Sequence, residues 1–230
     1  MIEPTASVDV SDVQRMFMTR VYRWMFLGLG LTALVAYGIS DSPAILEPLL
    51  MNRGLRIGLL LGQLGLVIVL SAMATRLSGA VATLLFFAYA ALNGVTFSTL
   101  LYVYDPASTA RAFLLTALTF GGMSIYGTVT RRDLTGWGSF LFMGLFGVVI
   151  AGLINLFVGS SMMSFVISCA SVVIFTGLTA YDTQKLRAMA LAAESGTQVQ
   201  SLSILGALTL YLDFINLMLA LLRLTGDRRR

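Results

Sequence analysis

Histidine is absent from this sequence of 230 residues, and cysteine occurs only once, at Cys169. Without histidine the chain has no Ser-His-Asp or Cys-His catalytic centre and no HExxH zinc site. A single cysteine cannot form a disulfide within the chain. The sequence also has no GxxxxGKS or GxxxxGKT phosphate loop and no GxGD segment of an aspartyl intramembrane protease. We therefore expect neither an enzyme nor a bound cofactor.

Charged residues are scarce as well: only 11% of the residues are charged, whereas 57% are hydrophobic and the mean hydropathy is +0.87. A soluble domain normally has about 25% charged residues, so this chain has too little polar surface to cover a water-soluble globule. The lipid bilayer is the expected solvent for much of its surface. The net charge of +4 does not indicate a nucleic-acid partner, because the basic residues are scattered between apolar runs.

Seven apolar runs are long enough to cross a bilayer, which takes roughly 17–25 residues. Turn and charge signals separate them, and the connections are short. The first run begins near Trp24, after several charged residues, which indicates an uncleaved span rather than a signal peptide. The sequence predicts an all-α integral membrane protein, a bundle of seven transmembrane helices without a soluble domain. The predicted spans are 22–40, 55–75, 79–103, 110–130, 137–158, 162–186 and 201–223.

The basic residues predict the orientation of these spans. Eight of them lie in the N-terminal tail and in the loops after spans two, four and six, and three lie in the opposite loops. Basic loops stay in the cytoplasm, so we expect a cytoplasmic N-terminal tail at 1–20, a transmembrane domain at 21–224 and a basic C-terminal tail at 225–230. The arginines of that last tail disagree with the rule. Either the earlier loops outweigh them, or the last segment does not cross fully.

Two pairs of small residues have a spacing that lets membrane helices approach closely. They are Gly58 with Gly62 in the second predicted span and Gly147 with Ala151 in the fifth. We expect these pairs to pack helices of the bundle against each other.

Two aspartates, Asp182 and Asp213, lie inside the sixth and seventh predicted spans. An aspartate at the middle of a membrane costs about 2.5–3.5 kcal/mol on the insertion scale, so two of them need an explanation. Residues at one depth in an antiparallel helical hairpin are equally far from its turn. These two are equally far from residues 197–198, within the expected turn at 195–198. We therefore expect the carboxyl groups to face each other.

Facing carboxyl groups cannot both ionise freely and would titrate as a coupled pair. When ionised, the pair can bind a hard cation, which takes several oxygen ligands; when half-protonated, it can close on itself. Thr179 and Asn216 lie one turn away on the same helix faces, and Arg76 is a candidate partner at the cytoplasmic end of the second span. The plainer alternative is that the aspartates only hold the bundle together and that Arg76 anchors the membrane boundary.

Four segments of this sequence resemble the Bax inhibitor (TMBIM) family, most of all its bacterial inner-membrane members. The likeness extends from about Tyr22 to the C-terminal end. It implies a seven-helix bundle with the last helix central and a pH-dependent calcium leak. It also implies that Asp182 and Asp213 bind the ion and sense pH, and that Arg76 latches them. The segments are 126–134 (YGTVTRRDL), 138–144 (GSFLFMG), 175–185 (FTGLTAYDTQK) and 208–217 (LTLYLDFINL).

Three functions follow from these observations. The leading hypothesis is a passive, pH-gated calcium leak across a bacterial inner membrane. The second is a regulatory protein that binds a membrane protease or another membrane partner, because the resembled family includes members linked to protease inhibition and to suppression of cell death. In that case the aspartates are structural and residues 1–20 are the feature to test. The third is a proton-coupled transporter that uses the same carboxylates, but no inverted repeat supports it.

Overall fold

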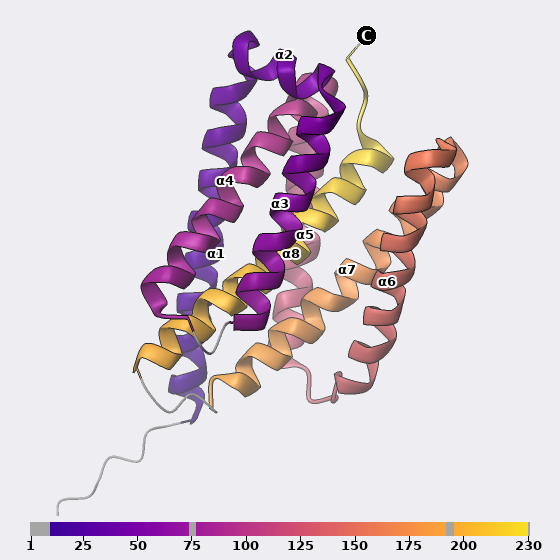
Figure 1. The fold of residues 1–230 in the computed structure, drawn as a ribbon. Coiled ribbons are helices and arrows are strands. Elements are labelled where there is room, and N and C mark those ends of the chain that lie inside the picture. Colours follow the sequence, from indigo (N-terminus) through magenta and orange to yellow (C-terminus); the bar gives the residue numbers. More distant parts are fainter. Residues whose placement is uncertain (1–9, 74–76, 192–195, 230) are drawn as a thin grey trace, which may run out of the picture.

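The computed structural model describes residues 10–73, 77–191 and 196–229, and in these ranges the chain forms eight helices (Figure 1). Seven of them are long and apolar enough to cross a membrane. This confirms the predicted all-α integral membrane bundle. The helices are α1 (Val10–Ser40), α2 (Pro43–Met51), α3 (Arg53–Met73), α4 (Gly79–Val103), α5 (Pro106–Val129), α6 (Thr135–Val158), α7 (Ser161–Met189) and α8 (Gly196–Thr225).

Two features at the start of the bundle differ from the predicted spans. Helix α1 begins at Val10, so part of the segment expected to be a tail is helical, and its residues Phe17 and Met18 are buried in the core. The short helix α2 occupies the connection between the first two spans. Of its two prolines, Pro43 stands at the start of the helix, where the missing N–H costs nothing, and Pro48 lies inside it.

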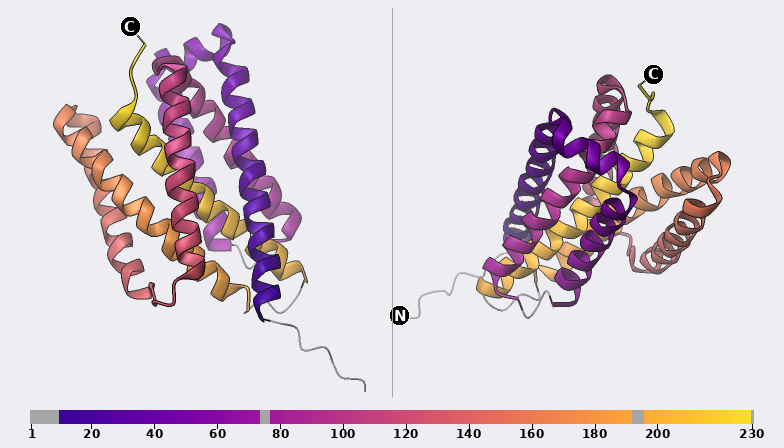
Figure 2. Two further views of the ribbon diagram at one scale, coloured as in Figure 1. Left: turned by 180° about the vertical axis from the view of Figure 1, so that it is seen from behind. Right: turned by 45° about the horizontal axis from the view of Figure 1, so that its top comes forward.

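Helix α8 lies in the middle of the bundle, as the resemblance implies. It runs obliquely between the other helices (Figures 1 and 2) and packs against α1, α4, α5 and α7. In its most apolar window 67% of the residues are buried, against 6% for both α3 and α6. The outer helices therefore face lipid over most of their surface, while α8 supplies more of the core than any other helix.

A hydroxyl pair fixes α8 to α1 and α4 within that core. The hydroxyl oxygens of Thr32 and Tyr211 are 2.6 Å apart, and the Thr32 oxygen is 2.9 Å from the carbonyl oxygen of Ala90. Tyr211 can donate to Thr32 while Thr32 donates to that carbonyl. Glycine at position 28 makes the close approach possible, because a side chain there would collide with the ring of Phe86.

The prediction for the two small-residue pairs is wrong. A methyl group placed at Gly58, Gly62 or Gly147 would meet no other atom within 4 Å in the described part of the chain. These positions face outward on α3 and α6. Close helix contacts occur instead at Gly127, which abuts the backbone of Ala180 on α7, and at other glycines of α4, α6 and α7.

The C-terminal segment is held at the turn between α4 and α5. The N–H of Asp105 donates to the carbonyl oxygen of Asp227 at 3.0 Å, and the N–H of Arg229 donates to that of Val103 at 2.9 Å. Arg111 forms an ion pair with Asp227 at 3.2 Å. This end of the bundle is opposite to the start of α1 (Figure 1), so α8 passes through the full length of the bundle.

Candidate functional site

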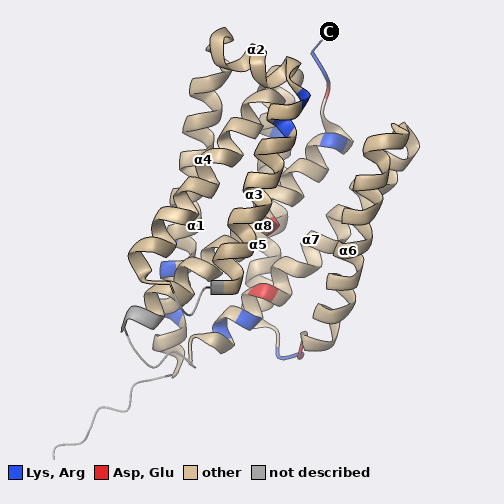
Figure 3. Ribbon diagram, in the orientation of Figure 1, with Lys and Arg blue, Asp and Glu red and all other residues tan. Residues whose placement is uncertain are grey.

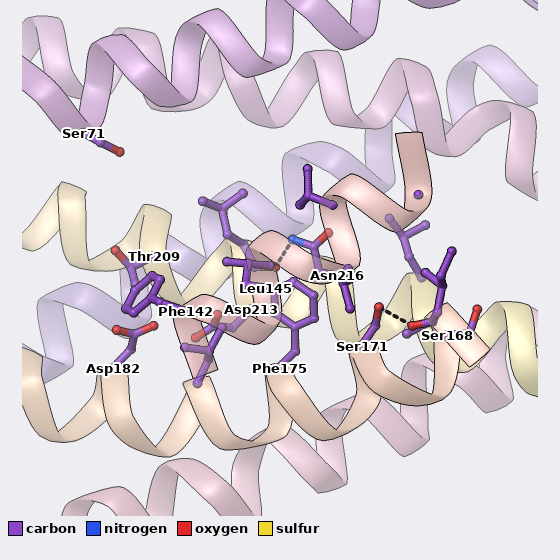
Figure 4. Close-up of a pocket in the computed structure, with 18 of the residues that line it drawn as sticks. Ser71, Phe142, Leu145, Ser168, Ser171, Phe175, Asp182, Thr209, Asp213 and Asn216 are labelled. Carbon is purple, nitrogen blue, oxygen red and sulfur yellow. Dashed lines mark hydrogen bonds between the residues drawn. The ribbon is translucent and has the colours of Figure 1, made fainter. Parts of the chain in front are cut away.

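The structure brings Asp182 of α7 and Asp213 of α8 together inside the bundle. The two residues are 5% and 3% exposed, and both side chains lie on the same side of one cavity (Figure 4). Acidic residues on α7 and α8 are visible in the interior of the bundle, whereas most basic residues lie towards its ends (Figure 3). Their proposed roles in ion binding and pH sensing stay predictions.

The predicted position of the turn between the sixth and seventh spans, residues 195–198, is wrong. Helix α8 already begins at Gly196, so residues 196–198 are helical, and Ser195 lies outside the described residues. Asp213 is therefore farther along its helix than the equal-depth argument assumed. The side chains still come close because α7 and α8 lie side by side along much of their length (Figure 1).

Asp213 has an unusual hydrogen-bonding state. Its Oδ2 atom is buried and has no hydrogen-bond partner, a condition that only the hydroxyl of Thr176 shares among the described side chains. Other acids are satisfied: Asp105 accepts from two N–H groups at the start of α5, and Asp227 pairs with Arg111. An unsatisfied buried polar group costs about 1–3 kcal/mol, so this oxygen is a cost to the fold.

Both aspartates line a cavity of about 620 Å³ between α3, α6, α7 and α8. Figure 4 shows a row of polar side chains along the α7–α8 side of this cavity, opposite Ser71 of α3. The remaining wall is mainly apolar and comes largely from α6. The polar row consists of Ser168, Ser171, Asp182, Thr209, Asp213 and Asn216.

Of the three residues predicted to assist the aspartate pair, only one lines the cavity in the described part of the chain. Asn216 lines the cavity, and its amide nitrogen donates to the carbonyl oxygen of Leu212 at 2.8 Å, which leaves its own oxygen for a ligand. Thr179 is fully buried, donates to the carbonyl oxygen of Phe175 at 2.7 Å and does not line the cavity. Arg76 lies outside the described residues.

Sequence reasoning missed several lining residues, among them two serines of α7 and two basic residues of α7 and α8. Ser168 and Ser171 are reached by stepping back from Asp182 in intervals of three and four residues along α7, so the helical period alone could have found them. Lys185 and Arg223 place positive charges in the cavity lining, both on exposed residues. Lys185 is one turn from Asp182, and its ammonium group lies 5.8 Å from the ring centre of Tyr181.

The segment around Asp182 also fixes the loop between α5 and α6. The Gln184 side chain donates to the carbonyl oxygen of Arg132 at 2.8 Å and accepts from the N–H of Leu134 at 2.9 Å. Asp133 accepts from the N–H and hydroxyl of Thr135, and these bonds lower the pKa of Asp133. Asp133 therefore supports the start of α6, at a distance from the cavity chemistry.

Among the described lining residues, the acidic ones are Asp182 and Asp213. Within the described ranges no group of three His, Cys, Asp or Glu side chains could hold a metal ion. Calcium takes 6–8 oxygen ligands. At the aspartate pair it would take the remaining ligands from hydroxyl and amide oxygens of the cavity and from water.

These features define a seven-helix integral membrane protein in which a central helix and its neighbour each bring a buried acid to one cavity. The chain belongs to the Bax inhibitor family: residues 14–230 match the family described as "Inhibitor of apoptosis-promoting Bax1". The resemblance found in the sequence is thereby confirmed.

Three bacterial relatives show how far the likeness extends. "Inner membrane protein YbhL" of Escherichia coli K12 is 50% identical over 215 residues, which cover 93% of this chain and 92% of the relative. An uncharacterized protein of Deinococcus radiodurans is 52% identical over 218 residues, which cover 94% and 93%. An uncharacterized protein of Borreliella burgdorferi is 41% identical over 230 residues, which cover 100% and 99%. The similarity therefore spans whole chains.

Proposed function

We propose that this protein is a passive, pH-dependent cation leak, with calcium as its ion. The observation that carries the proposal is the pair of buried carboxyl groups in one cavity, one of them with an oxygen that has no protein partner. A buried acid inside a membrane bundle is costly and is usually retained for ion or proton passage. The family resemblance supports calcium as the ion.

The protonation state of the pair would control the leak. When Asp182 and Asp213 are both ionised, they repel each other and together attract a cation. When they share a proton, they hold α7 and α8 together and lose most of that attraction. The other charged groups of the cavity are Lys185 and Arg223, and Arg76 is the proposed latch. On this account the flux rises with pH.

The site of action follows from the relatives and from the loops. We propose the bacterial inner membrane as the location, because a relative with 50% identity is named an inner membrane protein. The distribution of basic loops supports a cytoplasmic N-terminus. With seven crossings, the C-terminal segment would then lie on the outer side, despite its arginines.

The test is calcium flux into liposomes that contain the purified protein, measured between about pH 6 and 8, because a coupled pair of carboxyl groups changes its protonation in two steps. The variants are the wild type, the double variant Asp182→Asn with Asp213→Asn, and Asp41→Asn as a control acid outside the cavity. We expect a pH-dependent flux that only the double variant loses. Flux equal to that of empty liposomes at every pH would refute the leak.

One observation favours the second function, a regulatory protein that binds a membrane partner. Exposed residues Arg15, Arg20 and Arg23 surround a shallow hollow near the start of α1. Deleting residues 1–20 would also remove the buried Phe17 and Met18, so that truncation would confuse binding with folding. Charge reversal at Arg15 and Arg20 is the sharper test. Loss of a cellular effect with intact calcium flux would favour partner binding.

A further inference from the structure

The cavity that holds the two aspartates is open on the lipid-facing side of the bundle. Two of its lining residues, Phe142 and Val149, are 38% and 50% exposed and lie in the middle of α6. Ser71 of α3 lines it from the other side (Figure 4). Since α3 and α6 both span the membrane, this opening lies at the level of the lipid chains. The cavity that the two aspartates line can therefore be approached from the bilayer.

The walls of this cavity are more apolar than a path for a hydrated metal ion requires. Phe142 and Leu145 of α6 and Phe175 and Leu178 of α7 contribute hydrocarbon to the lining. A volume of about 620 Å³ falls within the range of roughly 300–1,000 Å³ that is typical of sites for organic ligands. Apolar walls around a few polar groups are also the usual composition of such sites.

The charge at the centre of the cavity selects the sign of the ligand. Asp182 and Asp213 both line the cavity and are largely buried (Figure 4), and the Oδ2 atom of Asp213 has no hydrogen-bond partner. The two basic residues of the lining, Lys185 and Arg223, are exposed on neighbouring surfaces. From α6 and from the described part of α3 no charged residue lines the cavity. A ligand with hydrocarbon groups and one positive charge complements this arrangement.

We propose that the cavity binds hydrophobic organic cations, namely quaternary or protonated ammonium ions that carry several hydrocarbon groups, and that it admits them from the bilayer between α3 and α6. The charge lies beside Asp213, and the hydrocarbon groups contact the phenylalanines, whose ring faces also attract ammonium groups. The site is that of the proposed leak, but the binding does not depend on calcium transport.

Binding of tetrabutylammonium to the protein in lipid nanodiscs tests this proposal by calorimetry, in buffer with a calcium chelator and with empty nanodiscs as the blank. We expect it to bind at least about tenfold more tightly than tetramethylammonium, because each buried methylene adds favourable free energy. We expect Asp213→Asn to weaken it about tenfold or more, because the partner charge is lost in a region of low dielectric constant. Equal affinities for the two ions, or unchanged affinity in Asp213→Asn, would overturn the proposal.

A matched pair of substitutions tests the lateral opening without touching the aspartates. Val149 lines the cavity, whereas its neighbour Ile150 is 56% exposed and does not. Val149→Trp should therefore reduce tetrabutylammonium binding, and Ile150→Trp should leave it unchanged. The same affinity in both variants would overturn the lateral opening. Calcium flux without ammonium binding refutes this inference alone, whereas ammonium binding without flux refutes the leak alone.

Discussion

Replacing Asp213 by asparagine keeps the shape of the side chain and removes its charge, so it tests whether this carboxyl group holds the bundle together or strains it. In the structure the residue is 3% exposed, its Oδ2 atom has no hydrogen-bond partner, and the carboxyl group of Asp182 lines the same cavity. The unsatisfied oxygen corresponds to about 1–3 kcal/mol. An asparagine can donate its amide to Asp182, so we expect the free energy of unfolding to rise by about 1–2 kcal/mol.

The assay is unfolding by denaturing detergent in mixed micelles at pH 8, with a chelator present so that bound calcium adds no stability. The control is Asp105→Ala, because Asp105 accepts from the N–H groups of Ala107 and Ser108 at the start of α5. Loss of that cap should lower stability by about 0.5–2 kcal/mol. If Asp213→Asn were instead destabilising by more than about 1 kcal/mol, the carboxyl group would be structural and the reasoning behind the leak would fail.

Three further predictions concern packing and capping. Gly127→Ala pushes a methyl group into α7 and should cost about 1–3 kcal/mol, whereas Gly122→Ala, which meets nothing within 4 Å, should be neutral or stabilising in the same unfolding assay. Thr32→Val leaves the buried hydroxyl of Tyr211 without its partner and should lower the free energy of unfolding by about 0.6–1.7 kcal/mol. Adding Tyr211→Phe to the Thr32→Val variant should cause no further loss of stability, because the unpaired hydroxyl is then gone. Because hydrogen bonds lower the pKa of Asp133, its carboxylate supports α6 above the ordinary pKa and stops doing so as the pH falls through the folded value. Hydrogen exchange in the first turn of α6 should therefore accelerate at acid pH in the wild type and change less in Asp133→Asn. An equal acceleration in both proteins would contradict this role of Asp133.

The helices of this protein could be predicted from sequence because each span is an apolar run that ends at a turn or charge signal. The start of α1 could not, because Asp12 and Arg15 conceal the fact that Phe17 and Met18 pack into the core. The short helix α2 could not be predicted either. Nine residues between two spans leave no room for a periodic pattern to show itself.

The candidate site was predictable in part. Aspartates in apolar runs are conspicuous, and a helical period of 3–4 residues leads from Asp182 to Ser171. The direction in which outer helices face was not predictable, since lipid and protein interior are equally apolar. A valine on a cavity wall and an isoleucine in lipid look alike, as Val149 and Ile150 show. The outward-facing pair Gly58 and Gly62 was misassigned for the same reason.

The central position of α8 has a consequence for how the protein is made. The helix that fills the middle of the bundle follows six other spans in the chain, so it leaves the ribosome after them. Until then α1, α4, α5 and α7 lack the surface against which they pack. The late helix also carries an acid, whose insertion into lipid costs about 2.5–3.5 kcal/mol. Packing of the core is thus completed only when α8 inserts, and it requires that the earlier helices are already in place around α8.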